Sequence, residues 1–90
     1  MTADHAAQDL RNKFGDLISE PTTFREEVTV QVSDPARIVE VCKVCKQEMG
    51  FDYLVDLSSV DNYGDDPRWT VVYELYSITD RCHLRLKTDV

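Results

Sequence analysis

Three strand-like runs separated by two short turns occupy the C-terminal half of this 90-residue chain. The runs cover residues 51–60, 69–78 and 82–88, and each is rich in β-branched, aromatic or other apolar residues. Residues 61–67 (DNYGDDP) hold the Asp, Asn, Gly and Pro that are typical of turns, and residues 79–81 (TDR) are shorter still. Because turns of this length join neighbouring antiparallel strands, the three runs predict a β-meander.

A fourth strand-like run, residues 24–33, precedes this meander. Apolar and polar side chains alternate along it, as in a strand with one buried face. The expected buried residues are Phe24, Val28, Val30 and Val32. The last run of the meander alternates in the same way, with Cys82, Leu84 and Leu86 facing inward and His83, Arg85 and Lys87 facing outward.

Two helices are predicted before and between these strands. Residues 6–18 carry apolar side chains at helical spacing, Pro21 ends this segment, and His5 lies before it in a tail that is expected to fray. The second helix starts at Asp34, which can cap it, and ends at Gly50. The apolar stripe of the second helix is Ile38, Cys42, Cys45 and Met49, with Val41 beside it.

The order of helix, strand, helix and three strands indicates an α+β fold. We expect a four-stranded, largely antiparallel sheet with the second helix packed on one face and an extra N-terminal helix. The composition, 42% hydrophobic and 30% charged, is that of a globular protein, and residues 1–90 suffice for a single domain. The chain stops at Val90, directly after the last predicted strand, so the domain is expected to be a truncated part of a longer subunit.

The charge of the chain argues against two classes of partner. Its formal net charge is −7, and its basic residues are scattered. Such an acidic surface repels phosphate backbones and anionic lipid, so neither nucleic-acid nor direct lipid binding is expected. No run approaches the ~20 apolar residues that cross a bilayer, and the N-terminus lacks the apolar core of a secretory signal. We therefore expect a cytoplasmic chain without a transmembrane segment.

Cys42 and Cys45 form a C-x-x-C motif, which can hold zinc, join an iron–sulfur cluster or exchange disulfides. Redox pairs of this kind lie at a helix N-terminus, whereas Cys42 falls about two turns inside its predicted helix. Structural zinc needs about four ligands, and Cys82, on a strand, is the one further cysteine. The spacing on the apolar stripe favours buried packing thiols. A small metal-binding or redox protein that uses the three cysteines is the alternative.

Asp56 and His83 are the candidates for acid–base chemistry. Asp56 lies inside an apolar run, and a carboxylate buried there needs a partner, for which we expect an arginine such as Arg68 or Arg85. His83 is predicted to face outward as a surface or interface histidine. An independent enzyme that uses Asp56 and His83 is the alternative. The chain has no phosphate-binding loop, dinucleotide-binding turn or Ser-His-Asp signature.

Three blocks of the sequence resemble a known family. They are GFDYLVDLSSVD at residues 50–61, PRWTVVYELYSI at residues 67–78 and HLRLK at residues 83–87. In order and spacing they are similar to the thirty-kilodalton subunit of respiratory complex I, the NADH-quinone oxidoreductase C subunit family. In that family a helix leads into a Phe-Asp-x-Leu-x-Asp strand, which is followed by an aromatic-rich Val-Val-Tyr strand and a basic strand with His, Leu and Arg. The resemblance covers residues 27–90.

The resemblance implies a non-catalytic assembly subunit in the hydrophilic arm of a proton-translocating NADH:quinone oxidoreductase. It implies a peripheral position on the cytoplasmic face of the inner membrane, in a complex that passes electrons from NADH to quinone. The partner would be the forty-nine-kilodalton-like subunit (the D subunit of the enzyme), which helps form the quinone site. No cofactor is expected in this chain, because flavin and iron–sulfur clusters belong to the partner subunits. The same module in a membrane-bound hydrogenase or formate hydrogenlyase-type complex is the alternative.

Five charged or ionisable side chains in or beside these blocks are the expected partner contacts. They are Asp56, Asp61, Arg68, His83 and Arg85. No residue is expected to be catalytic, cofactor-binding or metal-binding.

Overall fold

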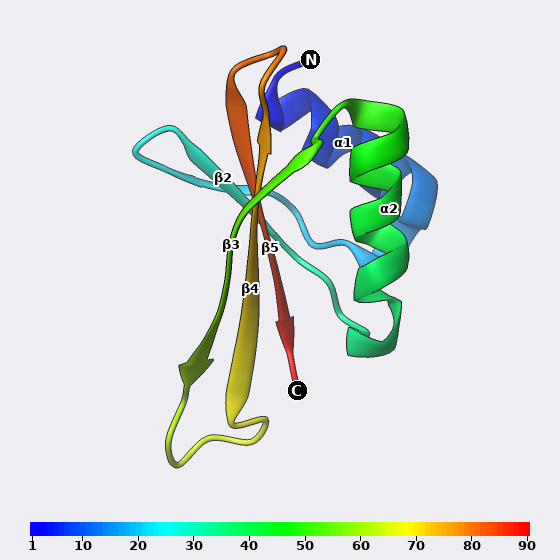
Figure 1. Ribbon diagram of the computed structural model, residues 1–90. Helices are drawn as coiled ribbons and strands as arrows, with labels where there is room; N and C mark the ends of the chain where they lie inside the picture. Colours follow the sequence, from blue (N-terminus) through cyan, green and yellow to red (C-terminus); the bar gives the residue numbers. More distant parts are fainter.

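The computed structural model describes residues 1–90 and contains two α-helices, two short 3₁₀ turns and five strands (Figure 1). In chain order these are α1 (Ala3–Phe14), η1 (Gly15–Leu17), β1 (Thr22–Phe24), β2 (Glu27–Gln31), η2 (Pro35–Arg37), α2 (Ile38–Met49), β3 (Tyr53–Asp61), β4 (Trp69–Ser77) and β5 (Cys82–Asp89). Both helices lie on one side of the sheet in Figure 1. The predicted α+β class is therefore confirmed, and the opposite side of the sheet, here the open face, carries no helix.

The strands form one sheet in the order β1-β2-β5-β4-β3. β3, β4 and β5 make the predicted antiparallel meander, and β5 also pairs in parallel with β2. The register places Val30 of β2 opposite Leu86 of β5, and both side chains are fully buried. The last strand in the chain therefore lies at the centre of the sheet, where it joins the meander to the N-terminal half.

The prediction of a single strand at residues 24–33 was wrong, because the chain reverses direction at Arg25 and Glu26. Both residues have a positive φ, 50° and 69°, as tight two-residue hairpin turns require. The reversal puts Phe24 at the end of β1, where it is 67% exposed instead of facing the core. The sheet therefore has five strands rather than the predicted four, and one of its edges is the three-residue β1.

The N-terminal helix α1 is part of the core, not an accessory to it. Ala6, Ala7 and Leu10 are fully buried, and α1 contacts β2 and β5. Small alanine side chains allow a helix to approach a sheet closely. The short apolar face of α1 is therefore enough to hold the helix against the sheet. The helix ends at Phe14 and not at the predicted Ile18, because Gly15 follows with a φ of 64°.

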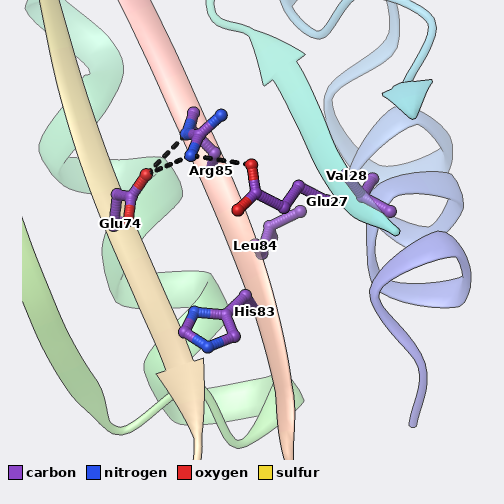
Figure 2. Close-up of a pocket in the computed structure, with 6 residues that line it drawn as sticks. All are labelled: Glu27, Val28, Glu74, His83, Leu84 and Arg85. Carbon is purple, nitrogen blue, oxygen red and sulfur yellow. Dashed lines mark hydrogen bonds and ion pairs between the residues drawn. The ribbon is translucent and has the colours of Figure 1, made fainter. Parts of the chain in front are cut away.

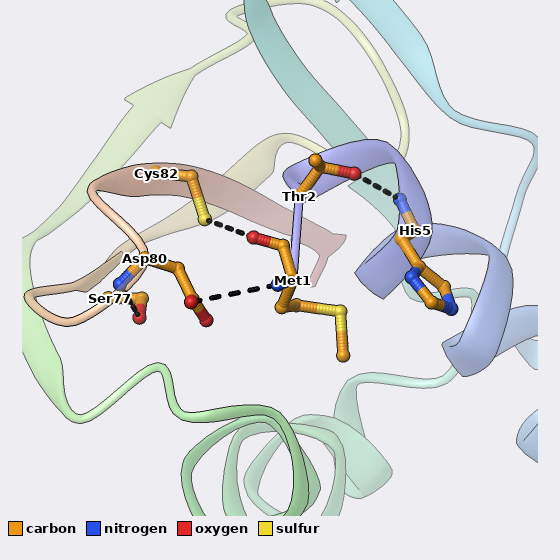
Figure 3. Close-up of polar contacts among 6 residues, drawn as sticks. All are labelled: Met1, Thr2, His5, Ser77, Asp80 and Cys82. Atoms are coloured by element: carbon orange, nitrogen blue, oxygen red, sulfur yellow. Dashed lines mark hydrogen bonds and ion pairs between the residues drawn. The ribbon is translucent and has the colours of Figure 1, made fainter.

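The residues before α1 are attached to the turn between β4 and β5 (Figure 3). The Met1 ammonium lies 3.6 Å from Asp80 Oδ1, and the Cys82 thiol donates to the Met1 carbonyl oxygen at 3.8 Å. Thr2 caps the helix, since its Oγ1 accepts a hydrogen bond from the His5 N–H at 3.1 Å. The expectation that His5 lies in a frayed tail was therefore wrong.

The second helical segment begins and ends close to the predicted residues. Asp34 Oδ1 accepts from the Ala36 N–H at 2.9 Å, and Gly50 takes a left-handed conformation with a φ of 76° after α2. The residues that α2 buries are Ile38, Val41, Val44, Cys45 and Met49. Cys42, which was predicted to belong to this buried stripe, is only half-buried at its margin. Val44, which was not predicted to belong to it, is buried instead.

Candidate partner-binding surface

The five expected contact residues do not form one cluster. His83, Arg85 and Asp56 lie on three different positions of the open face, on β5 and β3. Asp61 and Arg68 lie at the far end of the β3–β4 hairpin, which extends beyond the helices in Figure 1. Their surroundings are therefore considered separately.

Arg85 is held between two carboxylates on the open face (Figure 2). Its guanidinium donates from Nε to Glu74 Oε1 at 2.6 Å and from Nη2 to Glu27 Oε2 at 3.2 Å. The hydrogen bond to Glu74 is the largest of the effects that raise the pKa of Arg85 above its usual value. His83 lies beside this cluster, with its ring centroid 4.6 Å from that of Tyr76. The contacts tie β2, β5 and β4 together, so the charge of Arg85 is already matched within the chain.

Asp56 has none of the expected arginine partners, so that prediction was wrong. Arg85 is bound by Glu74 and Glu27, and Arg68 is bound by Asp61. The side chain of Asp56 is exposed on β3, opposite Glu74 in the register and next to a β-bulge. Water solvates an exposed carboxylate, so it needs no partner. The prediction failed because it assumed that an apolar strand is a buried one.

Asp61 and Arg68 form a bidentate ion pair across the turn that joins β3 to β4. Arg68 donates from Nε to Asp61 Oδ1 at 2.8 Å and from Nη2 to Asp61 Oδ2 at 2.9 Å. The same guanidinium lies 5.2 Å from the ring centroids of both Tyr63 and Trp69. The hydrogen bond to Asp61 raises the pKa of Arg68. This group of side chains gives the tip of the hairpin a defined, exposed aromatic and charged surface.

The three cysteines are free thiols. Burial raises the pKa of Cys42 and Cys82, and it raises the pKa of Cys45 to about 12. No group of three or more His, Cys, Asp or Glu side chains is placed to hold a metal ion. A thiol whose pKa is raised by burial holds less of the thiolate form, which is the nucleophile in disulfide exchange. The geometry therefore favours the packing interpretation over a redox or metal-binding one.

Sequence reasoning missed that β3, an apolar strand, is exposed along its whole length. All nine residues of Tyr53–Asp61 are exposed, and the strand pairs only with β4. Five large apolar side chains on β3 are between 45% and 55% exposed: Tyr53, Leu54, Val55, Leu57 and Val60. An exposed apolar strand at a sheet edge marks an interaction site. The signal in the sequence is an apolar run that does not alternate, but such a run is equally typical of a buried strand.

A groove of about 230 Å³ lies between α2 and the start of β3. Its apolar lining is Cys42, Phe51, Leu54, Tyr73 and Leu75, and its charged members are Lys46 and Asp52. In the register Leu54 lies opposite Leu75, and Leu57 lies opposite Tyr73. Leu54 and Leu57 therefore share the helix side of the sheet, and together with the groove they form one apolar surface.

The comparisons with known proteins agree on one family. The sequence profile of the family described as "Respiratory-chain NADH dehydrogenase, 30 Kd subunit" matches residues 30–90, from within β2 through α2 and the whole meander. The chain belongs to this family. The resemblance of the three sequence blocks is thereby confirmed, and the candidate surface on β3 lies within the part of this thirty-kilodalton subunit family that the profile describes.

Curated relatives in the family extend further than this chain. The NADH-quinone oxidoreductase C subunit of Geotalea uraniireducens is 44% identical over 87 residues, which are 97% of this chain and 52% of the relative. The NADH-quinone oxidoreductase C subunit of Geobacter sulfurreducens is 38% identical over 88 residues, with 97% and 54% covered. The chain spans about half the length of these relatives.

A solved structure shares the fold of this family member. The trypsin-resistant fragment of Nqo5 superposes with a TM-score of 0.72 at 24% sequence identity, covering 100% of this chain and 71% of that one. The likeness supports the α+β architecture. Neither α1 nor α2 is long and apolar enough to pass through a bilayer.

Proposed function

We propose that this chain is a non-catalytic assembly module in the hydrophilic arm of a proton-translocating NADH:quinone oxidoreductase. Family membership supports the kind of complex, since its relatives carry the name of that enzyme. The observation that carries the assembly role is the exposed apolar strand β3 with its adjoining groove. Exposing apolar side chains to water is unfavourable in free energy, and a partner chain that covers them removes this penalty.

The proposed partner is the forty-nine-kilodalton-like subunit, which would be held in position while it helps form the quinone site. Electrons would pass from NADH to quinone through flavin and iron–sulfur clusters in the partner subunits. In this proposal the three free thiols of the chain serve packing. The chain would lie peripherally on the cytoplasmic face of the membrane, bound through its partners.

Affinity purification from native membranes tests this proposal. The native gene product is tagged, membranes are solubilised in mild detergent, and the proteins that co-purify are quantified by mass spectrometry against untagged cells. We expect the flavin- and cluster-bearing subunits of NADH dehydrogenase together with a forty-nine-kilodalton-like chain. Recovery of a nickel–iron hydrogenase large subunit would assign the module to a hydrogenase-type complex instead. A chain that is recovered alone would refute the assembly role.

A further inference from the structure

The two edges of the sheet differ in how well they are protected from further strand pairing. Natural sheets protect their edges with short strands, prolines, lysines or bulges. The β1 edge is only three residues long. The β3 edge has nine residues, no proline and no basic residue, and its single irregularity is a bulge between Leu54 and Asp56. One edge is thus closed to pairing by its length, and the other is open.

The open edge offers unpaired backbone groups. Because β3 pairs only with β4, the N–H and C=O groups that point away from β4 have no strand partner. We propose that an extended segment of a partner subunit adds to β3 as a further strand, with apolar side chains on the helix side and an arginine or lysine beside Asp56. This inference rests on the proposed assembly role and specifies the contact through which it is exercised. Strand addition of this type supplies main-chain hydrogen bonds for affinity and side-chain pockets for specificity.

The charges on β3 identify the kind of segment that fits. Asp56 and Asp61 are the only charged residues of the strand, and Asp61 is already bound by Arg68. Asp56 lies opposite Glu74, which shares Arg85 with Glu27, so Asp56 is the acid on this strand that has no counter-charge of its own. Opposite charges on neighbouring strands stabilise a sheet and like charges destabilise it. The partner residue beside Asp56 is therefore expected to be basic.

The same charges disfavour a second copy of this chain as the occupant. Two β3 strands paired edge to edge would bring an acidic strand against an acidic strand. Each copy also carries a formal net charge of −7, so the two chains repel each other over a longer range. A basic segment of a different subunit meets neither obstacle.

The apolar side of the added strand also has a defined place. Leu54 and Leu57 face the helix side of the sheet, where the groove between α2 and β3 begins. Side chains alternate between the two faces of a strand, so a segment with apolar residues at every second position would lie along Leu54 and Leu57. One of its apolar side chains would enter the groove against Phe51 and Tyr73. The segment that fits thus alternates apolar residues with polar ones, one of which is basic.

Matched variants at the two edges test the proposal in the tagged native chain. Asp56→Lys and Leu57→Lys change the β3 edge, while Glu26→Lys and Phe24→Lys make the same changes in charge beside the β1 edge, where both side chains are also exposed. We expect the β3 variants to lower the recovery of partner subunits per tagged chain by about tenfold or more, and the β1 variants by less than about twofold. Circular dichroism of the four purified chains confirms that each is folded. Asp56→Glu, which keeps the charge, should retain recovery.

Amide hydrogen exchange gives a second readout that does not depend on variants. We expect β3 amides to exchange more slowly in the purified complex than in the purified chain, because an added strand accepts hydrogen bonds from the outward N–H groups. If partner subunits co-purify but the β3 variants match the β1 variants and β3 exchanges equally fast in both samples, strand addition is wrong and the assembly role stands. If no partner co-purifies with the wild-type chain, the assembly role itself is wrong. A dimer of the purified chain with protected β3 amides would make a second copy the occupant and overturn the proposal.

Discussion

β5 and β3 both carry leucines, yet these leucines have opposite surroundings. β5 lies at the centre of the sheet, where it contacts α1, and its Leu84 and Leu86 are at most 1% exposed. β3 lies at the edge of the sheet, where its start adjoins α2 at the groove, and its Leu57 is 54% exposed. The difference in exposure follows from position in the sheet, because β5 has a strand on both sides and β3 pairs only with β4. It teaches that the apolar content of this chain serves two purposes, folding in β5 and, by our proposal, assembly in β3.

The largest expected effect comes from a matched leucine deletion in the two strands. Leu86→Ala should lower the free energy of unfolding by about 2–5 kcal/mol, since it leaves a cavity in the core. Leu57→Ala should change it by less than about 0.5 kcal/mol, because that side chain is largely in water already. Urea denaturation followed by circular dichroism measures both. Equal losses would mean that β3 is as important to folding as β5, which would contradict the division of roles between the two strands.

A substitution at Gly50 tests the connection between the buried helix α2 and the exposed strand β3. The Gly50 φ of 76° is unfavourable for a residue with a Cβ, so Gly50→Ala should cost about 1–2 kcal/mol. The added Cβ would meet only Ser77 Oγ at 3.8 Å, an ordinary contact, so the cost is one of backbone conformation. Thermal unfolding should show the loss, with the exposed Gln47→Ala as a control on the same helix. A neutral result would show that the junction tolerates another conformation.

The buried thiol of Cys45 should make the free energy of unfolding decrease as the pH rises into the alkaline range. Burial raises its pKa from 9.0 to about 12, so the folded state holds the proton more tightly than the unfolded state. The corresponding stability is complete below about pH 9 and is lost as the pH rises toward 12, with a loss of about 1 kcal/mol at pH 10. Cys45→Ala should therefore lose less stability than the wild type between pH 8 and pH 10 in urea denaturation. Cys82→Ala, which removes a less buried thiol, should have a smaller effect on the stability lost between pH 8 and pH 10. An equal loss of stability in the wild type and Cys45→Ala over this pH range would contradict the account.

The smallest expected effects concern the two arginine clusters. Arg85→Met should lower the free energy of unfolding by no more than about 1 kcal/mol, because it leaves Glu74 and Glu27 together without their cation in a partly solvated site. Arg68→Met, at the exposed hairpin tip, should have a smaller effect. Thermal unfolding at low and high salt measures both, and salt should reduce the differences. A larger loss for Arg68→Met would place the tip of the hairpin among the elements that hold the fold.

Much of the fold could be predicted because its signals are local. The meander follows from the turn residues of 61–67, and the second helix follows from Asp34 and Gly50. The β1–β2 hairpin could not be predicted, because its turn is Arg25-Glu26 and lacks the Gly or Asn that usually marks positive φ. The parallel pairing of β2 with β5 joins segments far apart in the chain, and no short-range pattern records it.

The site was harder to predict than the fold. The sequence drew attention to Asp61, Arg68 and Arg85, whose role as partner contacts stays a prediction, but their partners within the chain depend on register. Asp56 was assigned an arginine that lies elsewhere, because the pattern of β3 cannot tell an edge strand from a central one. The distinction is made by the order of strands in the sheet, which is a property of the whole chain.

The central place of β5 also has a consequence during synthesis. The ribosome releases β1, β2, both helices, β3 and β4 before β5, so the sheet lacks its middle strand until residue 89 has emerged. Until then β2 and β4 each present an unpaired edge, and α1 lacks one of the two strands that it contacts. Non-local pairing of this kind slows folding and prolongs the exposure of aggregation-prone edges. The nascent chain is therefore expected to be prone to aggregation until β5 has emerged and filled the gap between β2 and β4.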